Sequence, residues 1–286
     1  MNKLLNYSIN RAAMYKYWKI FFVNILLVGI GLSMVSCEKY RMNRDKSIAS
    51  DNVLAETSML DLFYVADRFI RMELDTVVPP SSGVCPVRTV EMTSGGYPII
   101  ITVDYAGGCE DQFGVNRSGQ LRIVLTGPYK EAPTSVTVST IDYSVNNFDV
   151  DGEIVIGQRV ISAGQNQRFQ VNIPELNINL NNGSVINWNG NYTFEWVRGD
   201  ETPGFIFDDE YKITGSSSGT NRDDYEYTAK IEEPLYYTMG CRWVHTGKTE
   251  IRPTDFKKRT IDFGEGNCDN KAELKIGNRN YTLSLR

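Results

Sequence analysis

Histidine is nearly absent from this sequence, which contains only His245 among 286 residues. A single histidine excludes a zinc site built from several histidines and any relay that needs a second one. No serine or cysteine beside His245 forms a nucleophile motif, and Gly215–Gly219 lacks the lysine and following helix of a phosphate-binding loop. We therefore expect no metal, no cofactor and no enzymatic activity, and we interpret His245 as a hydrogen-bonded strand residue.

Long apolar runs are also scarce, and the only one is Ile20–Val35. It is somewhat short for a membrane span, which needs about 18–20 residues. The residues that precede it include four basic ones, Lys3, Arg11, Lys16 and Lys19. A basic flank, an apolar run and a small residue, in that order, are typical of a secretory signal peptide.

The end of the apolar run, Met34-Val35-Ser36-Cys37, resembles a bacterial lipobox. The resemblance implies that residues 1–36 are a cleaved signal peptide and that Cys37 is acylated. Acyl chains hold a protein at a membrane because each buried methylene contributes about 0.8 kcal/mol. The polar segment 37–50 is then a flexible tether, and we expect a lipid anchor in the outer membrane, on its periplasmic or its cell-surface face. The alternative is an uncleaved N-terminal helix with a chance cysteine.

The chain without residues 1–36 is acidic. It keeps 26 basic against 35 acidic side chains, a net charge of −9. Such a surface repels phosphates, so we expect no nucleic acid partner.

One helix is predicted over residues 51–78. Apolar side chains recur at helical spacing, and Pro79-Pro80 ends any continuation. The apolar positions are Leu54, Met59, Leu62, Phe63, Ala66, Phe69 and Ile70. We expect this stripe to pack on a β domain; the alternative is a lid over a lipid-binding groove.

Residues 79–286 alternate apolar and polar side chains in short runs, which is typical of half-buried antiparallel strands. Examples are Val136/Val138, Phe169/Val171/Ile173, Leu176/Ile178/Leu180, Tyr192/Phe194/Trp196, Tyr225/Tyr227/Ala229/Ile231 and Tyr281/Leu283/Leu285. Turns are predicted at Asp151-Gly152, Asn182-Gly183, Asn189-Gly190 and Gly277-Asn278. The fold class is therefore mainly β: an antiparallel β-sandwich or a strongly curved meander sheet, with one N-terminal helix.

Two segments echo each other, Thr102–Glu110 and Thr260–Asp269. Each contains a cysteine and has a second cysteine upstream, so the echo suggests two related β units. With Cys37 acylated, an even set of four cysteines remains, which in an exported protein favours disulfides. The echo selects the pairs Cys85–Cys109 and Cys241–Cys268. Free buried thiols are the alternative, and no pair has the close spacing of a zinc knuckle.

Three weaker features bear on ligands. The carboxylate groups Asp208–Glu210 and Asp223–Glu226 could supply the acid and base of a glycosidase or bind calcium, although acidic loop tips are usually only solvated. Aromatic residues crowd the C-terminal half, where rings could stack on sugars or peptides or form core pairs. They are Trp188, Trp196, Trp243, Phe205, Phe207, Tyr225, Tyr227, Tyr236 and Tyr237. Asp75-Thr76-Val77 resembles the O-glycosylation acceptor of exported Bacteroidetes proteins, which makes Thr76 a candidate for modification.

Several stretches together resemble uncharacterised envelope lipoproteins of Bacteroidetes. They are Met34–Cys37, Tyr143–Asn147, Asp209–Gly215, Cys241–Val244 and Thr260–Gly264. The resemblance implies an envelope lipoprotein with an all-β fold and transfers no activity. Our leading hypothesis is a non-enzymatic, membrane-tethered module that binds a glycan or an envelope protein, or supports an assembly. The alternatives are a carrier of lipid or another apolar ligand and a carboxylate-dependent glycoside hydrolase.

Overall fold

The structure is a computed structural model that describes residues 40–74, 85–129, 131, 133–160, 166–202 and 204–285. Cys37 and Thr76 lie outside the described residues. Residues 1–45 and 46–286 are separate compact units. In the first unit, the structure describes a helical turn at residues 40–42; all that follows concerns the second unit.

None of the described helices is long and apolar enough to span a membrane.

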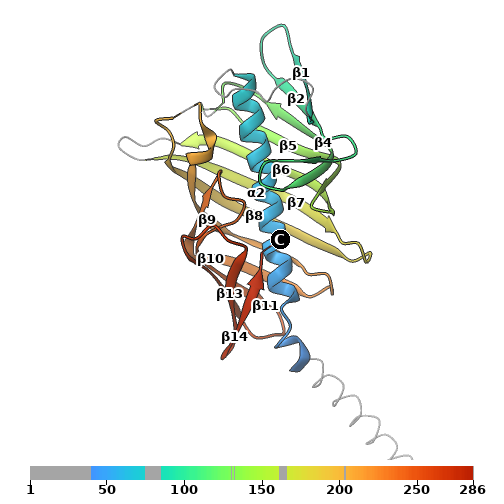
Figure 1. Cartoon of the computed structure of the whole chain (residues 1–286), viewed down its shortest axis with the longest axis vertical. Coiled ribbons are helices and arrows are strands. Elements are labelled where there is room, and N and C mark those ends of the chain that lie inside the picture. Colours follow the sequence, from blue (N-terminus) through green and yellow to red (C-terminus); the bar gives the residue numbers. More distant parts are fainter. Residues whose placement is uncertain are drawn as a thin grey trace, which may run out of the picture. The chain divides into compact units, whose positions relative to one another are not determined.

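The described residues of the second unit form one antiparallel sheet of 14 strands (Figure 1). The strands are β1 (Val87–Met92), β2 (Ile99–Asp104), β3 (Cys109–Glu110), β4 (Asn116–Leu125), β5 (Val136–Val145), β6 (Phe148–Val160), β7 (Gln167–Asn179), β8 (Val185–Arg198), β9 (Glu210–Thr220), β10 (Glu226–Thr238), β11 (Thr246–Pro253), β12 (Arg259–Glu265), β13 (Lys271–Ile276) and β14 (Arg279–Ser284). Apart from the short β3, which pairs with β4, every strand pairs with its neighbours in sequence. The prediction of a mainly β, antiparallel fold is confirmed. The arrangement is the open curved meander rather than the two facing sheets of a sandwich.

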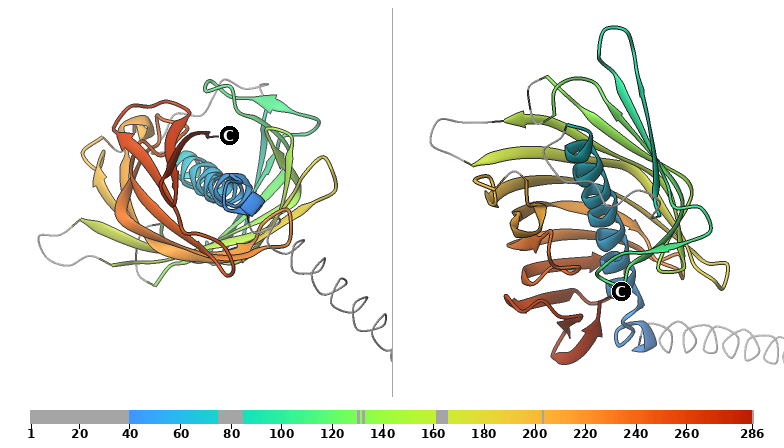
Figure 2. Two further views of the ribbon diagram at one scale, coloured as in Figure 1. Left: turned by 90° about the horizontal axis from the view of Figure 1, so that it is seen from below. Right: turned by 45° about the horizontal axis from the view of Figure 1, so that its top comes forward.

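Bulges at the middle of the long strands bend the sheet. The register shifts between β6 and β7 beside Gly152, between β7 and β8 around Pro174, and between β9 and β10 around Pro234. An extra residue on one strand bends it and increases its twist. The aligned bulges therefore curve the sheet around its concave face, as Figure 2 shows.

Two of the four predicted turns are wrong. Asn182-Gly183 and Gly277-Asn278 are turns, but Gly152 lies inside β6 and Gly190 inside β8. The reason is close packing: a Cβ on Gly152 would lie 2.4 Å from the Glu175 carbonyl oxygen, and one on Gly190 would lie 2.7 Å from the Tyr192 ring. Glycine inside a strand often marks such an approach.

Helix α2 (Ser47–Glu73) lies along the concave face of the sheet (Figure 2). It begins earlier than predicted, because Ile48 and Ala49 are completely buried and belong to its first turn. The last four residues of the predicted tether are therefore helical. Of the 27 helix residues, 21 are buried, so the helix is covered on nearly every side instead of packing through one stripe.

Aromatic side chains fill the space between α2 and the sheet. The Phe63 ring lies 4.8 Å from the Phe194 ring and 5.1 Å from the Tyr211 ring, measured between centroids. Each such side chain contributes roughly 1.5–3 kcal/mol when fully buried. Of the nine aromatic residues singled out in the sequence, Trp188, Trp196, Tyr227 and Tyr237 are buried in the core. Four more are half-buried: Phe207, Tyr225, Tyr236 and Trp243. Phe205 is the exception, with 53% of its surface exposed.

Candidate functional site

The concave face is the obvious place for a ligand in a curved sheet, and α2 occupies it. Polar groups of the helix bond to the sheet along its whole length. Near the start, Arg222 Nε donates to Asp51 at 2.9 Å. Near the end, Tyr129 donates to Asp67 at 2.6 Å, and Arg71 bonds to Asp209. The helix is thus fixed at both ends by buried polar contacts.

The middle of α2 is tied to β4 and β5 through Asp61. Arg117 Nε donates to Asp61 Oδ1 at 3.0 Å, and Tyr143 donates to Asp61 Oδ2 at 2.6 Å. A second carboxylate, Asp111, accepts from Arg117 at 2.7 Å. Burial disfavours the charge of Arg117, yet Asp61 and the other partners raise its pKa well above the ordinary value. The guanidinium of Arg117 therefore stays charged although it is buried.

Glu56 is a buried carboxyl in the same interface. Tyr192 donates to it at 3.4 Å, and its helix neighbour Asn52 accepts from Trp188 Nε1 and Ser217 Oγ, each at 3.3 Å. Burial raises the pKa of Glu56 to about 7, against the opposing effect of its hydrogen bonds to Asn52 and Tyr192. Protonation of this group therefore falls within the physiological pH range.

A narrow face of α2 stays partly exposed in a slit between the two ends of the sheet. The partly exposed helix residues there include Thr57, Asp61 and Arg68. Over the slit, Phe113 of the β3–β4 turn meets Phe207 at 5.6 Å between ring centroids. The enclosed space beside Thr57 and Asp61 amounts to only about 40 Å³. A second space, beside Arg68 and Cys109, amounts to about 160 Å³. Both are smaller than the several hundred Å³ of a typical ligand pocket.

Both predicted disulfides are present and lie beside the slit. Cys85–Cys109 flanks the helix at Tyr64 and Arg68, and Cys241–Cys268 holds the loop on the other side. The echo around them has a local structural basis. Asp104 Oδ1 accepts the Ala106 N–H at 2.7 Å, and Asp262 Oδ1 accepts the Gly264 N–H at 3.0 Å. Each echoed segment thus repeats the same hydrogen bond from the backbone N–H two residues on to an aspartate, at the end of β2 and within β12.

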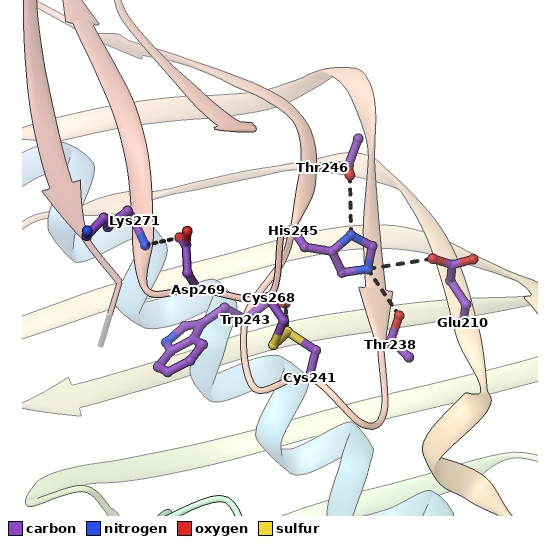
Figure 3. Close-up of a disulfide and its surroundings, with 9 residues drawn as sticks. All are labelled: Glu210, Thr238, Cys241, Trp243, His245, Thr246, Cys268, Asp269 and Lys271. Atoms are coloured by element: carbon purple, nitrogen blue, oxygen red, sulfur yellow. Dashed lines mark hydrogen bonds and ion pairs between the residues drawn. A yellow bond between two sulfur atoms is a disulfide. The ribbon is translucent and has the colours of Figure 1, made fainter. Parts of the chain in front are cut away.

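His245 lies on the outer face of the sheet, beside the Cys241–Cys268 bridge (Figure 3). Its Nε2 is 3.1 Å from Thr238 Oγ1 and 3.6 Å from Glu210 Oε1, and its Nδ1 is 3.2 Å from Thr246 Oγ1. Burial lowers the pKa of His245, which Glu210 opposes and Arg198 reinforces. A lowered pKa favours the neutral ring at pH 7. The predicted hydrogen bonding is confirmed, but the predicted strand position is wrong, because His245 lies in the loop directly before β11.

The geometry around His245 does not activate a nucleophile. In a relay, the hydroxyl and the carboxylate bind opposite nitrogens of the imidazole. Here the Thr238 hydroxyl and the Glu210 carboxylate share Nε2, while Nδ1 meets another hydroxyl. The shallow hollow in front of them also includes Arg198, Phe207 and Tyr236. The site offers donors, acceptors and rings for contact with a ligand.

The two carboxylate clusters do not meet. They flank opposite ends of the 11-residue strand β9, which at about 3.3 Å per residue separates them by roughly 35 Å. Within the first cluster, Asp209 points inward to Arg71, Glu210 contacts His245, and Asp208 accepts from Thr202 at 2.7 Å. A glycosidase needs its two carboxylates about 5–10 Å apart, and this arrangement does not supply that pair.

Within the described part of the chain, no three His, Cys, Asp or Glu side chains are grouped so that they could hold a metal ion. No family model, curated protein or solved structure gives a significant match to this chain.

Sequence reasoning missed the buried partners of α2. The sequence analysis predicted packing through the apolar stripe alone and assigned no partners to Asp51, Glu56, Asp61, Asp67 and Arg71. One signal was present: these residues follow one another at intervals of four to six, so they occur all around the helix. A helix without a continuous apolar face needs polar partners in the sheet.

Proposed function

We propose that this chain is an envelope lipoprotein, anchored to the outer membrane through Cys37, that binds a glycan or an envelope protein on the outer surface of its sheet without catalysing a reaction. One observation carries the proposal: α2 fills the concave face and bonds to the sheet at both ends and in the middle. Only the outer face and the rim of the sheet are then available to a partner.

The filled concave face also separates this function from its rivals. A carrier of lipid needs an apolar cavity of several hundred Å³, whereas the slit beside α2 encloses about 40 Å³. A glycosidase needs a facing carboxylate pair, and the clusters at Asp208 and Asp223 lie at opposite ends of β9. Neither rival has an observation in its favour.

The test combines anchoring with binding. The full chain and a Cys37→Ser variant would be expressed in a Gram-negative host, and membranes would be separated from soluble protein. We expect the full chain in the outer-membrane fraction and the variant in the soluble fraction. The full chain, purified in detergent, would then be applied to a glycan array. In a separate experiment, intact cells would be crosslinked and the envelope proteins bound to the chain would be identified. Absence of both glycan and protein partners would overturn the proposal.

A further inference from the structure

The outer face of β8 and β9 carries a surface without charge. The outward side chains of β8 from Asn187 to Thr193 are three asparagines and one threonine, and those of β9 from Thr214 to Thr220 are two threonines and two serines. We call this surface the amide–hydroxyl face. Charged residues make up 23% of the chain, and they return directly beside it, where Glu195 pairs with Arg168 and Lys212. The neutral surface is therefore a local departure from an acidic protein.

Cross-strand hydrogen bonds hold these side chains in place. Asn187 Nδ2 donates to Thr220 at 3.0 Å, Ser218 donates to Asn189 Oδ1 at 3.0 Å, and Asn172 of β7 donates to Asn191 Oδ1 at 2.7 Å. The Nδ2 groups of Asn189 and Asn191 form no further bond within the described residues and lie on the exposed side. Ordering these groups on binding costs little entropy, because their rotamers are already fixed.

The spacing of this surface suits an extended hydroxylated ligand. Neighbouring strands lie about 4.8 Å apart, and outward side chains along one strand are about 6.8 Å apart. Donors and acceptors therefore repeat in two directions at intervals comparable to a sugar ring. A shallow hollow of about 730 Å³ joins Asn187, Asn189 and Ser218 to a charged border formed by Glu175, Glu226 and Arg252, and it gives a chain a place to bind.

We propose that the amide–hydroxyl face binds a neutral polysaccharide, an inference that rests on the proposed binding function. Hydroxyl groups of the sugar bond to the amides of Asn189 and Asn191 and to the hydroxyls of β9. The outward side chains of the face itself carry no cation for an anionic polysaccharide. The cations at its border, Lys230 opposite Ser216 and Arg252 at the hollow, are paired with Glu232 and Glu250, and the acidic chain repels a polyanion. The rings of Trp188 and Tyr192 are buried on the opposite side of β8, so recognition is by hydrogen bonds spread over several sugars.

A second copy of the chain fits this surface poorly. The sheet is convex here (Figure 2), and two convex surfaces touch only along a narrow band. A flexible linear polymer can instead follow the curve and bond to successive strands. Curvature therefore favours a polysaccharide over self-association.

The experiment is a binding titration by affinity electrophoresis of the full chain in detergent. The probes are a soluble neutral β-glucan, a neutral mannan and polygalacturonate. The variants are Asn189→Ala/Asn191→Ala and, as a matched control, Asn280→Ala, which removes an exposed asparagine from β14. We expect retardation by at least one neutral polymer and none by polygalacturonate. The double variant should bind at least tenfold more weakly, with unchanged circular dichroism, and the control should match the wild type.

The possible failures separate the two proposals. If the wild type binds a neutral polymer and the double variant binds it equally well, the amide–hydroxyl face is not the site, but the binding function stands. Binding of polygalacturonate alone, of an envelope protein alone, or self-association that the double variant abolishes would each overturn this inference. Absence of any glycan or protein partner would overturn the proposed function as well.

Discussion

Replacement of Arg117 by methionine tests whether buried charge fixes α2 in the sheet. Arg117 bonds to Asp61 of the helix and to Asp111 of the β3–β4 turn, and its own side chain is 4% exposed. Methionine keeps much of the volume but leaves two carboxylates without their cation. Breaking a buried pair from one side costs about 3–5 kcal/mol. In a unit of this size, 1 kcal/mol corresponds to roughly 2–4 °C, so the midpoint of thermal unfolding should fall by about 6–20 °C.

The assay is thermal unfolding, with urea unfolding for the free energy, both with intact disulfides and followed by tryptophan fluorescence. Trp188 donates to Asn52 of α2 and therefore reports on helix docking. Lys248→Met is the matched control, because Lys248 pairs with Glu233 and Asp262 on the surface, and its midpoint should stay at the wild-type value.

A triple variant separates lost charge from lost packing. In Asp61→Asn/Asp111→Asn/Arg117→Met, no carboxylate is left unpaired in the cluster, so we expect recovery of a large part of the lost stability. If the free energy of unfolding of Arg117→Met lies within about 1 kcal/mol of the wild-type value, the buried pair does not hold the helix, and the reasoning is refuted.

Three further predictions follow from the same contacts. Burial raises the pKa of Glu56 to about 7, above its value in the unfolded chain. Because the folded state then holds the proton more tightly, the contribution of this group to the free energy of unfolding falls by roughly 3 kcal/mol as the pH rises from about 4.5 to 7. In urea titrations across this range, Glu56→Gln should remove that pH dependence. The variant Cys241→Ala/Cys268→Ala opens a loop with a sequence separation of 27. Its free energy of unfolding should be about 3–4 kcal/mol lower than that of the oxidised wild type. Equal stability of the two proteins would contradict the bridge. Metabolic labelling with palmitate should mark the wild type and not Cys37→Ser, and equal labelling of both would place the anchor elsewhere.

Local features of the fold could be predicted from the sequence because they depend on short spacing. Alternation in Phe169/Val171/Ile173 and Tyr192/Phe194/Trp196 predicts strands, and those residues face inward in β7 and β8. The disulfide pairing could be predicted as well, because the two echoed segments repeat the same strand and the same aspartate hydrogen bond.

Long-range features could not be predicted in the same way. Two facing sheets and one curved sheet bury the same alternating residues, and the choice depends on bulges, which the alternating pattern does not record. The contact of Asp61 with Arg117 spans 56 residues, and that of Arg71 with Asp209 spans 138. No periodicity records such a pairing. Likewise, Asp208, Asp209 and Glu210 are adjacent in sequence, yet each meets a different partner.

The polar contacts of α2 also explain why the concave face should stay closed to ligands. An apolar helix in an apolar trough could slide or rotate at little cost, because dispersion and hydrophobic burial are not directional. Asp51, Asp61 and Asp67 have fixed partners in the strands and in the turns between them, so a shift by one turn would leave several charges buried and unpaired. Buried charged contacts of this kind contribute less to the free energy of unfolding than to fixing one register of the helix against the sheet. A helix held in one register keeps the concave face filled, which supports the proposal that recognition uses the outer face.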